Sequence, residues 1–253
     1  MTPILAVRGL ARTFTSRDGS ATPALRATDL DVAENDFVTI LGPSGCGKST
    51  LLRIVAGLDA PTSGEVLLDG RRIEGAGADR GMVFQSYTLF PWLTVIDNIC
   101  FGLRERGVAR VEQLAIANGF VAKVGLVGFE HHYPKQLSGG MQQRTAIARA
   151  LANGPRILLM DEPFGALDEM TREHMQDELI RICAETGTTV IFVTHSIPEA
   201  VYLSNRVVVM SRRPGRLVAD IPVELGERTE DTREAPEFFK KITEVREALR
   251  GIE

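Results

Sequence analysis

One glycine-rich segment, residues 42–50, has the composition of a phosphate-binding loop. Its pattern is G-x-x-x-x-G-K-[ST], and it lies between an apolar run and a stretch with helical period. Glycines let backbone N–H groups curl around a phosphate, and the helix N-terminus adds positive potential. Lys48 would supply a point charge for the phosphates, and the Ser49 hydroxyl can ligate Mg²⁺. The residues expected around the phosphates are Gly42, Pro43, Ser44, Gly45, Cys46, Gly47, Lys48, Ser49 and Thr50.

Two carboxylates follow a second apolar run. Residues 157–160 predict a buried strand, and Asp161 and Glu162 come at its carboxyl end, the edge at which open α/β sheets bind ligands. Asp161 would hold Mg²⁺ through water, and Glu162 would orient and polarise an attacking water. An apolar strand that ends in Asp-Glu is common, so the phosphate loop is what gives this pair its weight.

The segment Leu137–Arg144 offers a second anion site. Ser138 is expected to cap a helix, and Gly139 and Gly140 leave the first N–H groups of that helix uncovered. The spacing alone fits a glycine-rich cap without a ligand equally well. If the segment does bind an anion, one chain would carry two anion-binding helix N-termini but only one phosphate loop.

Taken in order, these motifs resemble those of the ATP-binding-cassette (ABC) family. Residues 138–144 resemble its signature segment, and Gln85 follows a predicted strand as the lid glutamine of that family does. Asp168 lies in a segment similar to the family's dimer-contact loop. His195 and Phe14 stand where the family has a switch histidine and an aromatic that stacks on adenine. Each position alone is a weak signal, and their common order is what makes the resemblance specific.

The resemblance, over about residues 4–225, implies an ATPase that works as a head-to-tail dimer with a second copy of itself. Each ATP would lie between the phosphate loop of one copy and Ser138–Gly140 of the other. His195 would contact the γ-phosphate. The residues implied in catalysis are Glu162, His195 and Lys48; those implied in Mg²⁺ binding are Ser49, Gln85 and Asp161; those implied in further nucleotide contacts are Phe14 and Asp168.

The predicted elements alternate between strands and helices, which indicates an α/β fold with a parallel sheet. The resemblance makes this a P-loop NTPase cassette with a parallel-sheet core, an N-terminal antiparallel β-subdomain and a helical subdomain inserted at about 86–155. The cassette is expected to span 1–225, and a charged tail with a short helix to follow at 226–253. Strands are expected at 37–41, 65–69, 81–84, 157–160, 189–193 and 207–210, and helices at 49–57, 111–124 and 170–186, with others beginning after Thr94, after Ser138 and at Pro236.

The composition excludes several classes of protein. With 253 residues, 44% apolar and 25% charged, the chain is long and apolar enough to fold around a core. Its net charge of −4 argues against a general nucleic-acid coat protein. No apolar run approaches the ~20 residues of a membrane helix, and the first residues do not resemble a signal peptide. The three widely spaced cysteines suit a reducing compartment. We therefore expect a cytoplasmic protein that would reach a membrane only through a partner. The family resemblance implies a peripheral position at the cytoplasmic face of the inner membrane.

Residues 86–99 are unusually aromatic and apolar for a predicted surface. They fit a groove for a partner helix, or ordinary helix packing. The segment resembles the Leu-Pro-Trp-Leu-type segment of importers for nitrate, taurine and alkanesulfonates, with Phe90 where many of these have Leu. This resemblance implies a membrane permease that contacts Gln85–Ile99, an extracytoplasmic solute-binding protein in the full complex, and no nucleic acid. The alternatives are an ABC ATPase of a lipid-transport or division system, or an ATP-dependent interaction module that does not transport.

Overall fold

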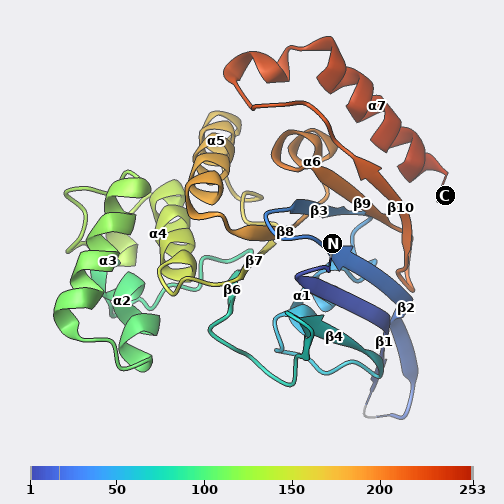
Figure 1. Cartoon of the computed structure of the whole chain (residues 1–253), viewed down its shortest axis with the longest axis horizontal. Helices are drawn as coiled ribbons and strands as arrows, with labels where there is room; N and C mark the ends of the chain where they lie inside the picture. Colours follow the sequence, from blue (N-terminus) through green and yellow to red (C-terminus); the bar gives the residue numbers. More distant parts are fainter. Residues whose placement is uncertain (1, 17, 252–253) are drawn as a thin grey trace. The chain divides into compact units, whose positions relative to one another are not determined.

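The computed structural model describes residues 2–16 and 18–251, and it separates into two compact units (Figure 1). The first unit combines residues 1–77 with 189–253, and the second contains residues 78–188. Within the described ranges no helix combines the length and the apolar character that a bilayer crossing requires.

An antiparallel sheet at the start of the first unit agrees with the N-terminal antiparallel β-subdomain that the resemblance implied. Leu5 faces Val32 across β1 and β2, and Phe14 faces Thr22. A turn at Asp18 joins these strands. The sheet order is β2-β1-β4-β5, with β1 at Leu5–Thr15, β2 at Ala21–Val32, β4 at Ser63–Leu68 and β5 at Arg71–Arg72.

A second group of strands in the first unit carries the phosphate loop. Strand β3 pairs in parallel with both β8 and β9, and β10 pairs with β9 in the antiparallel sense. All six residues of β8 are buried, as expected for a strand covered on both faces. The bounds are Phe37–Leu41 for β3, Thr189–Thr194 for β8, Arg206–Met210 for β9 and Leu217–Pro222 for β10. The predicted strands at 37–41, 189–193 and 207–210 are confirmed.

The helix after the phosphate loop, α1, spans Lys48–Val55 instead of the predicted 49–57. Gly47, with φ of 111°, is its N-cap, so Lys48 already belongs to the helix. Gly57 has φ of 74°, a left-handed conformation that turns the chain away from the helix and favours glycine.

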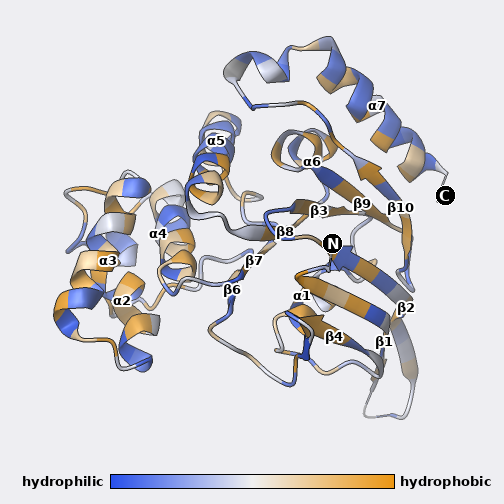
Figure 2. Cartoon of the chain, in the orientation of Figure 1, coloured by the Kyte–Doolittle hydropathy of each residue, from blue (hydrophilic) through white to orange (hydrophobic). Residues whose placement is uncertain are grey.

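Helix α7 (Pro236–Arg250) runs along the outside of α6 (Ile197–Leu203) and β9, and is drawn in red in Figure 1. Phe238, Ile242 and Val245 recur at helical spacing and are buried, whereas Leu249, one turn further along, is only half-buried. Figure 2 shows mostly hydrophilic residues along the rest of α7. A short 3₁₀ turn, η2, precedes it at Glu230–Arg233.

The second unit joins two parallel strands to four helices. Strand β6 (Arg80–Val83) pairs with β7 (Ile157–Asp161). Helix α2 packs against both α3 and α4. The bounds are Val95–Glu105 for α2, Arg110–Lys123 for α3, Gly139–Leu151 for α4 and Glu169–Thr186 for α5, with a 3₁₀ turn, η1, at Pro134–Gln136.

Both predicted helix caps of the second unit are present. The Thr94 hydroxyl accepts a hydrogen bond from the Asp97 N–H at 3.3 Å, and the Ser138 hydroxyl accepts one from the Met141 N–H at 3.3 Å. Helix α4 ends at Leu151, with Ala152 as its C-cap.

Candidate nucleotide-binding site

The phosphate loop joins β3 to α1 within the first unit. The Lys48 side chain is only 5% exposed, and its ammonium donates to the carbonyls of Gly42 at 2.8 Å and Pro43 at 3.0 Å. These two bonds hold the positively charged ammonium group against the backbone at the start of the phosphate loop. A phosphate placed there would gain a charge-assisted hydrogen bond from Lys48.

Two glycines give this loop its shape. Gly45 and Gly47 both have positive φ, at 75° and 111°, which side chains rarely tolerate. A Cβ on Gly47 would lie 2.7 Å from Leu25 Cδ2 and 2.9 Å from the Ala24 carbonyl. Because Gly47 also has no side chain to cap α1, the first N–H groups of the helix remain available to an anion. The geometry therefore fits a nucleotide phosphate.

Of the other loop residues, Ser44, Gly45 and Ser49 are exposed, and Thr50 is half-buried. The exposed Ser49 hydroxyl is a hard oxygen ligand at the start of the helix and fits Mg²⁺. Cys46 is buried, and burial raises the pKa of its thiol, so at neutral pH it is a small packing residue.

His195 follows β8 and is exposed at the end of the strand. The residues on either side hold the backbone there. The Thr194 hydroxyl donates to the buried Glu199 carboxylate, and it also accepts from the Ser196 N–H at 3.0 Å. The Ser196 hydroxyl in turn accepts from the Glu199 N–H at 3.4 Å, as the N-cap of α6. This network was not predicted from the sequence, although Ser196-x-x-Glu199 has the spacing of a capping box.

Phe14 lies near the end of β1 with 38% of its surface exposed. The Arg12 guanidinium lies over its ring, 4.6 Å from the ring centre. Arg12 thus covers one face of the ring. The exposed ring is consistent with stacking on a flat ligand.

The predicted carboxylate pair lies in the second unit. Residues Ile157–Met160 of β7 are buried, and Asp161 ends the strand half-buried. Glu162 has φ of 43°, a left-handed conformation that costs a non-glycine residue on the order of 1 kcal/mol or more. Backbone strain of this kind is common at catalytic positions, and here it occurs at the residue directly after the end of β7.

The second anion-binding segment is closely packed at both glycines. A Cβ on Gly139 would lie 2.9 Å from the Tyr87 hydroxyl, and one on Gly140 would lie 3.1 Å from Thr171 Cγ2. Ser138 is exposed at the N-cap of α4. Larger residues at 139 or 140 would displace these neighbours, so packing within the second unit is itself a reason for glycine here.

Gln85 is exposed two residues beyond β6. Asp168 is the N-cap of α5, where its carboxylate accepts from the Thr171 N–H at 3.0 Å, and this bond lowers the pKa of Asp168. The family resemblance gave Asp168 a dimer contact and no part in capping. Capping α5 does not exclude a dimer contact by Asp168, because this residue is also exposed to solvent.

The aromatic segment at 86–99 divides into an outward and an inward part. Trp92 is 70% exposed, whereas Val95, Ile96 and Ile99 are buried in α2. Asn98, also buried, donates to the carbonyls of Phe90, Leu93 and Thr94 at 3.2, 3.0 and 2.9 Å, and accepts from the Phe90 N–H at 2.9 Å. This one side chain holds the loop that displays Trp92. Ordinary helix packing accounts for 95–99, but not for Trp92.

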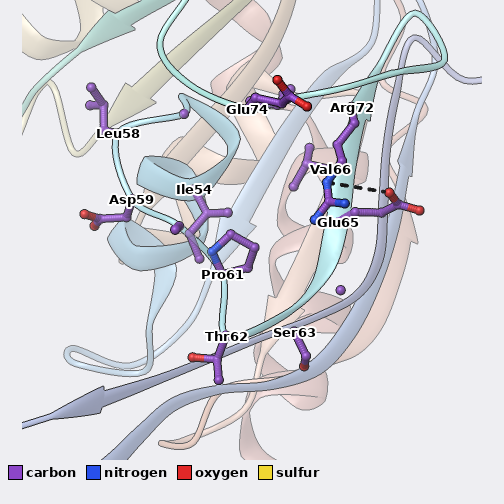
Figure 3. A pocket seen from close by; sticks show the side chains of 14 residues that line it. Ile54, Leu58, Asp59, Pro61, Thr62, Ser63, Glu65, Val66, Arg72 and Glu74 are labelled. Carbon is purple, nitrogen blue, oxygen red and sulfur yellow. Dashed lines mark ion pairs between the residues drawn. The ribbon is translucent and has the colours of Figure 1, made fainter.

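Another cavity has no residue of the phosphate loop in its lining. It has a volume of about 680 Å³ and is lined by residues 54, 57–66 and 72–74 of the first unit (Figure 3). Two of its lining residues form an ion pair, Arg72 Nε with Glu65 Oε2 at 3.9 Å. None of the residues assigned to nucleotide chemistry lines it, so we do not treat it as the catalytic site.

The chain is similar in sequence to one family model and to several known ATP-binding proteins. Residues 25–165 match the family model described as ABC transporter. The chain is 55% identical, over 95% of its length and 90% of the relative's, to an uncharacterized ABC transporter ATP-binding protein of Methanocaldococcus jannaschii. It is 46% identical to a nitrate import ATP-binding protein of Synechocystis, over 98% of this chain and 96% of the relative. It is 48% identical to a taurine import ATP-binding protein of Rhizobium johnstonii, over 94% and 92%.

Solved structures agree with these relatives. A dimeric bacterial ABC transporter cassette superposes with a TM-score of 0.77 at 35% identity, covering 87% of this chain and 99% of that one. A second structure of the same cassette, dimeric and in a post-hydrolysis state bound to ADP and phosphate, superposes with a TM-score of 0.75 at 35% identity, over the same shares of the two chains. The chain belongs to the ABC transporter family, as one of its ATP-binding cassettes.

Proposed function

We propose that this protein is the ATP-hydrolysing subunit of an ABC importer that takes up a small solute through a separate membrane permease. The observation that carries the proposal is similarity along nearly the whole chain to nitrate and taurine import ATP-binding proteins, at 46% and 48% identity. Nitrate, taurine, an alkanesulfonate or a similar compound is the solute class that this similarity favours.

In this proposal the phosphate loop binds the ATP phosphates and the Phe14 ring stacks on the adenine. Lys48 neutralises developing charge on the phosphates, Glu162 orients the attacking water, and His195 contacts the γ-phosphate. We assign Mg²⁺ binding to Ser49, Gln85 and Asp161; the ion would neutralise phosphate charge. The exposed hydroxyl of Ser49 and the half-buried Asp161 at its strand end support this assignment.

We further propose a head-to-tail dimer, in which Ser138–Gly140 and Asp168 of one copy approach the phosphate loop of the other. The dimeric state of the two similar cassette structures supports a dimer. Hydrolysis would remove the γ-phosphate that both copies bind, and so release them from one another. The cassette would span 1–225, with helices inserted at about 86–155 and a tail at 226–253.

The permease contact is assigned to Gln85–Ile99. Trp92 supports this assignment, because a tryptophan 70% exposed on a loop fixed by Asn98 has the chemistry and the rigidity of an interface anchor. The protein would then sit at the cytoplasmic face of the inner membrane, and a solute-binding protein would deliver the solute from the other side.

Purification from native membranes tests this assignment. The tagged chain is isolated in mild detergent, and the proteins that accompany it are identified by mass spectrometry. We expect a multi-span permease of the small-solute importer type. A lipid-transport or division protein in its place would contradict the importer assignment, and so would nucleic acid or ribosomes without a membrane partner.

A matched pair of variants locates the contact. Trp92→Ala is expected to reduce permease recovery at least tenfold, because it removes the anchor. Phe239→Ala, which removes an aromatic 57% exposed on α7, should leave recovery within twofold of the wild type. Equal recovery with both variants would show that Trp92 does not hold the permease. Circular dichroism checks that both variants fold.

A further inference from the structure

The loop between β6 and α2 is held in a strained conformation. It spans residues 84–94 and displays Trp92, and we call it the Trp92 loop. Thr88 in this loop has φ of 46°, a left-handed conformation that a β-branched residue rarely adopts. Such a conformation persists only where neighbouring groups hold it. The groups around Thr88 therefore decide how the loop presents Trp92.

Arg149, in the last turn of α4, holds the strained part of the loop. Its guanidinium donates to the Thr88 carbonyl at 2.7 Å, to the Thr88 hydroxyl at 3.2 Å and to the Tyr87 carbonyl at 3.4 Å. The same group lies 5.5 Å from the centre of the Phe90 ring. Burial lowers the pKa of this guanidinium, and hydrogen bonds in such a place face less competition from water. Arg149 thus restrains both the backbone of the loop and one of its aromatic side chains.

Phe90 connects this restraint to Trp92. The two ring centres are 5.6 Å apart, and Phe90 also packs against Phe101 of α2 with ring centres 4.3 Å apart. Asn98 holds the backbone of the same loop from the side of α2. Trp92 is therefore supported from two helices, by Asn98 from α2 and by Arg149 through Phe90 from α4.

The Trp92 loop also contacts the opposite end of α4. A Cβ on Gly139, in the first turn of that helix, would lie 2.9 Å from the Tyr87 hydroxyl. The loop therefore meets α4 near both of its ends, at Gly139 through Tyr87 and at Arg149 through Thr88. All of these residues belong to the second unit. A displacement of α4 would act on the loop at both contacts.

We propose that Arg149 is a positioning residue for the permease contact: it holds the Trp92 loop against α4, and Trp92 keeps its orientation only while these bonds are intact. The inference rests on the proposed function, which assigns the permease contact to Gln85–Ile99. Because Thr88 is strained, the loop relaxes to another conformation once Arg149 no longer holds it. The loop then follows α4, the helix that begins with the segment assigned to the partner copy's ATP.

Time-resolved fluorescence anisotropy of the full chain without nucleotide tests this role, because Trp92 is the single tryptophan of the sequence. Part of the anisotropy decays by fast local motion of the ring, and the rest by tumbling of the whole protein. Arg149→Ala should roughly double the fast part, because the loop can leave its strained conformation. Arg149→Lys keeps the charge but not the forked donor, and it should give an intermediate value.

Arg106→Ala is the matched control. Arg106 is the C-cap of α2, and its guanidinium donates to the Asn153 carbonyl at 2.8 Å. The variant also removes an arginine that bonds to a backbone carbonyl close to the end of α4, but that carbonyl lies outside the Trp92 loop. The anisotropy decay should stay unchanged. Circular dichroism checks folding, and Arg149→Lys against Arg106→Lys gives the same comparison if an alanine variant does not fold.

The strain at Thr88 supplies a second comparison. Asparagine adopts the left-handed conformation more readily than threonine does, so Thr88→Asn relieves the strain. In the Thr88→Asn background, Arg149→Ala should increase the fast part of the decay by less than half as much as it does in the wild-type background. Equal increases in the two backgrounds would contradict the proposal, because Arg149 would then not be holding a strained loop.

Two further results would overturn it: an unchanged anisotropy decay in Arg149→Ala, or the same increase in Arg106→Ala. Permease recovery from native membranes is the functional measurement. Arg149→Ala should lower recovery at least threefold relative to Arg106→Ala, and equal recovery would overturn the role in the permease contact. The anisotropy measurement needs no permease. If no permease accompanies the wild-type chain, the proposed function fails, and the decay still decides whether Arg149 holds the Trp92 loop.

Discussion

At the scale of single residues, the structure shows how His195 is held at the end of β8. Thr194 bonds to both the Glu199 carboxylate and the Ser196 N–H. We predict that Thr194→Val, which keeps the shape of the side chain, lowers kcat about tenfold, or roughly 1.4 kcal/mol in the barrier, because His195 loses its fixed position. Steady-state ATP hydrolysis measures kcat and KM, and KM for ATP should change less than twofold.

The control for this variant is Thr243→Val, at an exposed α7 threonine that donates to the Phe239 carbonyl at 3.0 Å. It removes the same hydroxyl from a position remote from β8 in the sequence and should leave kcat unchanged. Equal kcat values in the two variants would show that the Thr194 network is structural only.

The buried thiol of Cys183 leads to a prediction about how the stability of the protein depends on pH. Burial raises the pKa of this thiol to about 12 from an ordinary value of 9.0. Between these values the unfolded chain has lost the proton and the folded chain keeps it, so unfolding releases a proton and stability falls as pH rises. The contribution is fully present below pH 9. The slope is about 1.4 kcal/mol per pH unit for one proton.

We therefore predict that the free energy of unfolding decreases less steeply between pH 9 and pH 11 in Cys183→Ala than in the wild type. Urea unfolding at several pH values measures the slope of each protein. Only the difference between the two slopes is informative, because lysines and tyrosines titrate in both proteins. Parallel slopes would mean that the folded protein ionises this thiol as readily as the unfolded chain does.

At the scale of elements, Asn98 connects α2 to the loop before it. Its side chain makes four hydrogen bonds to backbone groups of Phe90, Leu93 and Thr94. Asn98→Ala would remove all four bonds. The Phe90 and Thr94 carbonyls would still accept from the N–H groups of Leu93 and of residue 98, at 3.1 and 2.8 Å, but the half-buried Phe90 N–H and Leu93 carbonyl would lose the bonds to this side chain, at about 1–3 kcal/mol for each group that water cannot reach. We predict a loss of about 2–4 kcal/mol in the free energy of unfolding, measured in urea.

Asn118→Ala provides the comparison, because Asn118 is exposed on α3 and has no such network among the described residues. It should change the unfolding free energy by less than about 0.5 kcal/mol. A similar small change in Asn98→Ala would show that water satisfies the freed loop groups and that Asn98 does not fix Trp92.

Elements with strong local signals could be predicted from the sequence. The apolar run at 37–41 and the caps at Thr94 and Ser138 were correct because each depends on neighbouring residues alone. Helix α6 was missed: it has seven residues and contains a proline, too short for a periodic pattern. Strand β10 was missed because it includes a charged residue and alternates at an exposed sheet edge.

At the scale of the whole molecule, order along the chain was the informative signal. The motifs led to the ABC family because the phosphate loop, the signature segment and the Asp161-Glu162 strand follow in a fixed sequence, and the family is confirmed by the matched model. Contacts between distant segments could not be predicted in this way. The cavity that Gly42 lines together with residues of α7, and the close approach of Gly215 to the Cys46 carbonyl, depend on packing across about 170 residues or more and leave no local pattern.

The most direct test of the account is the behaviour of Glu162→Gln with Mg·ATP. We predict that hydrolysis falls at least about a hundredfold, that ATP binding is retained, and that light scattering shows an ATP-dependent dimer of the 27.6 kDa chain. The control Glu112→Gln, at an exposed position on α3, should hydrolyse ATP as the wild type does. A Glu162→Gln variant that stays monomeric with ATP bound, or hydrolyses ATP within about threefold of the wild type, a difference below 1 kcal/mol, would contradict the account.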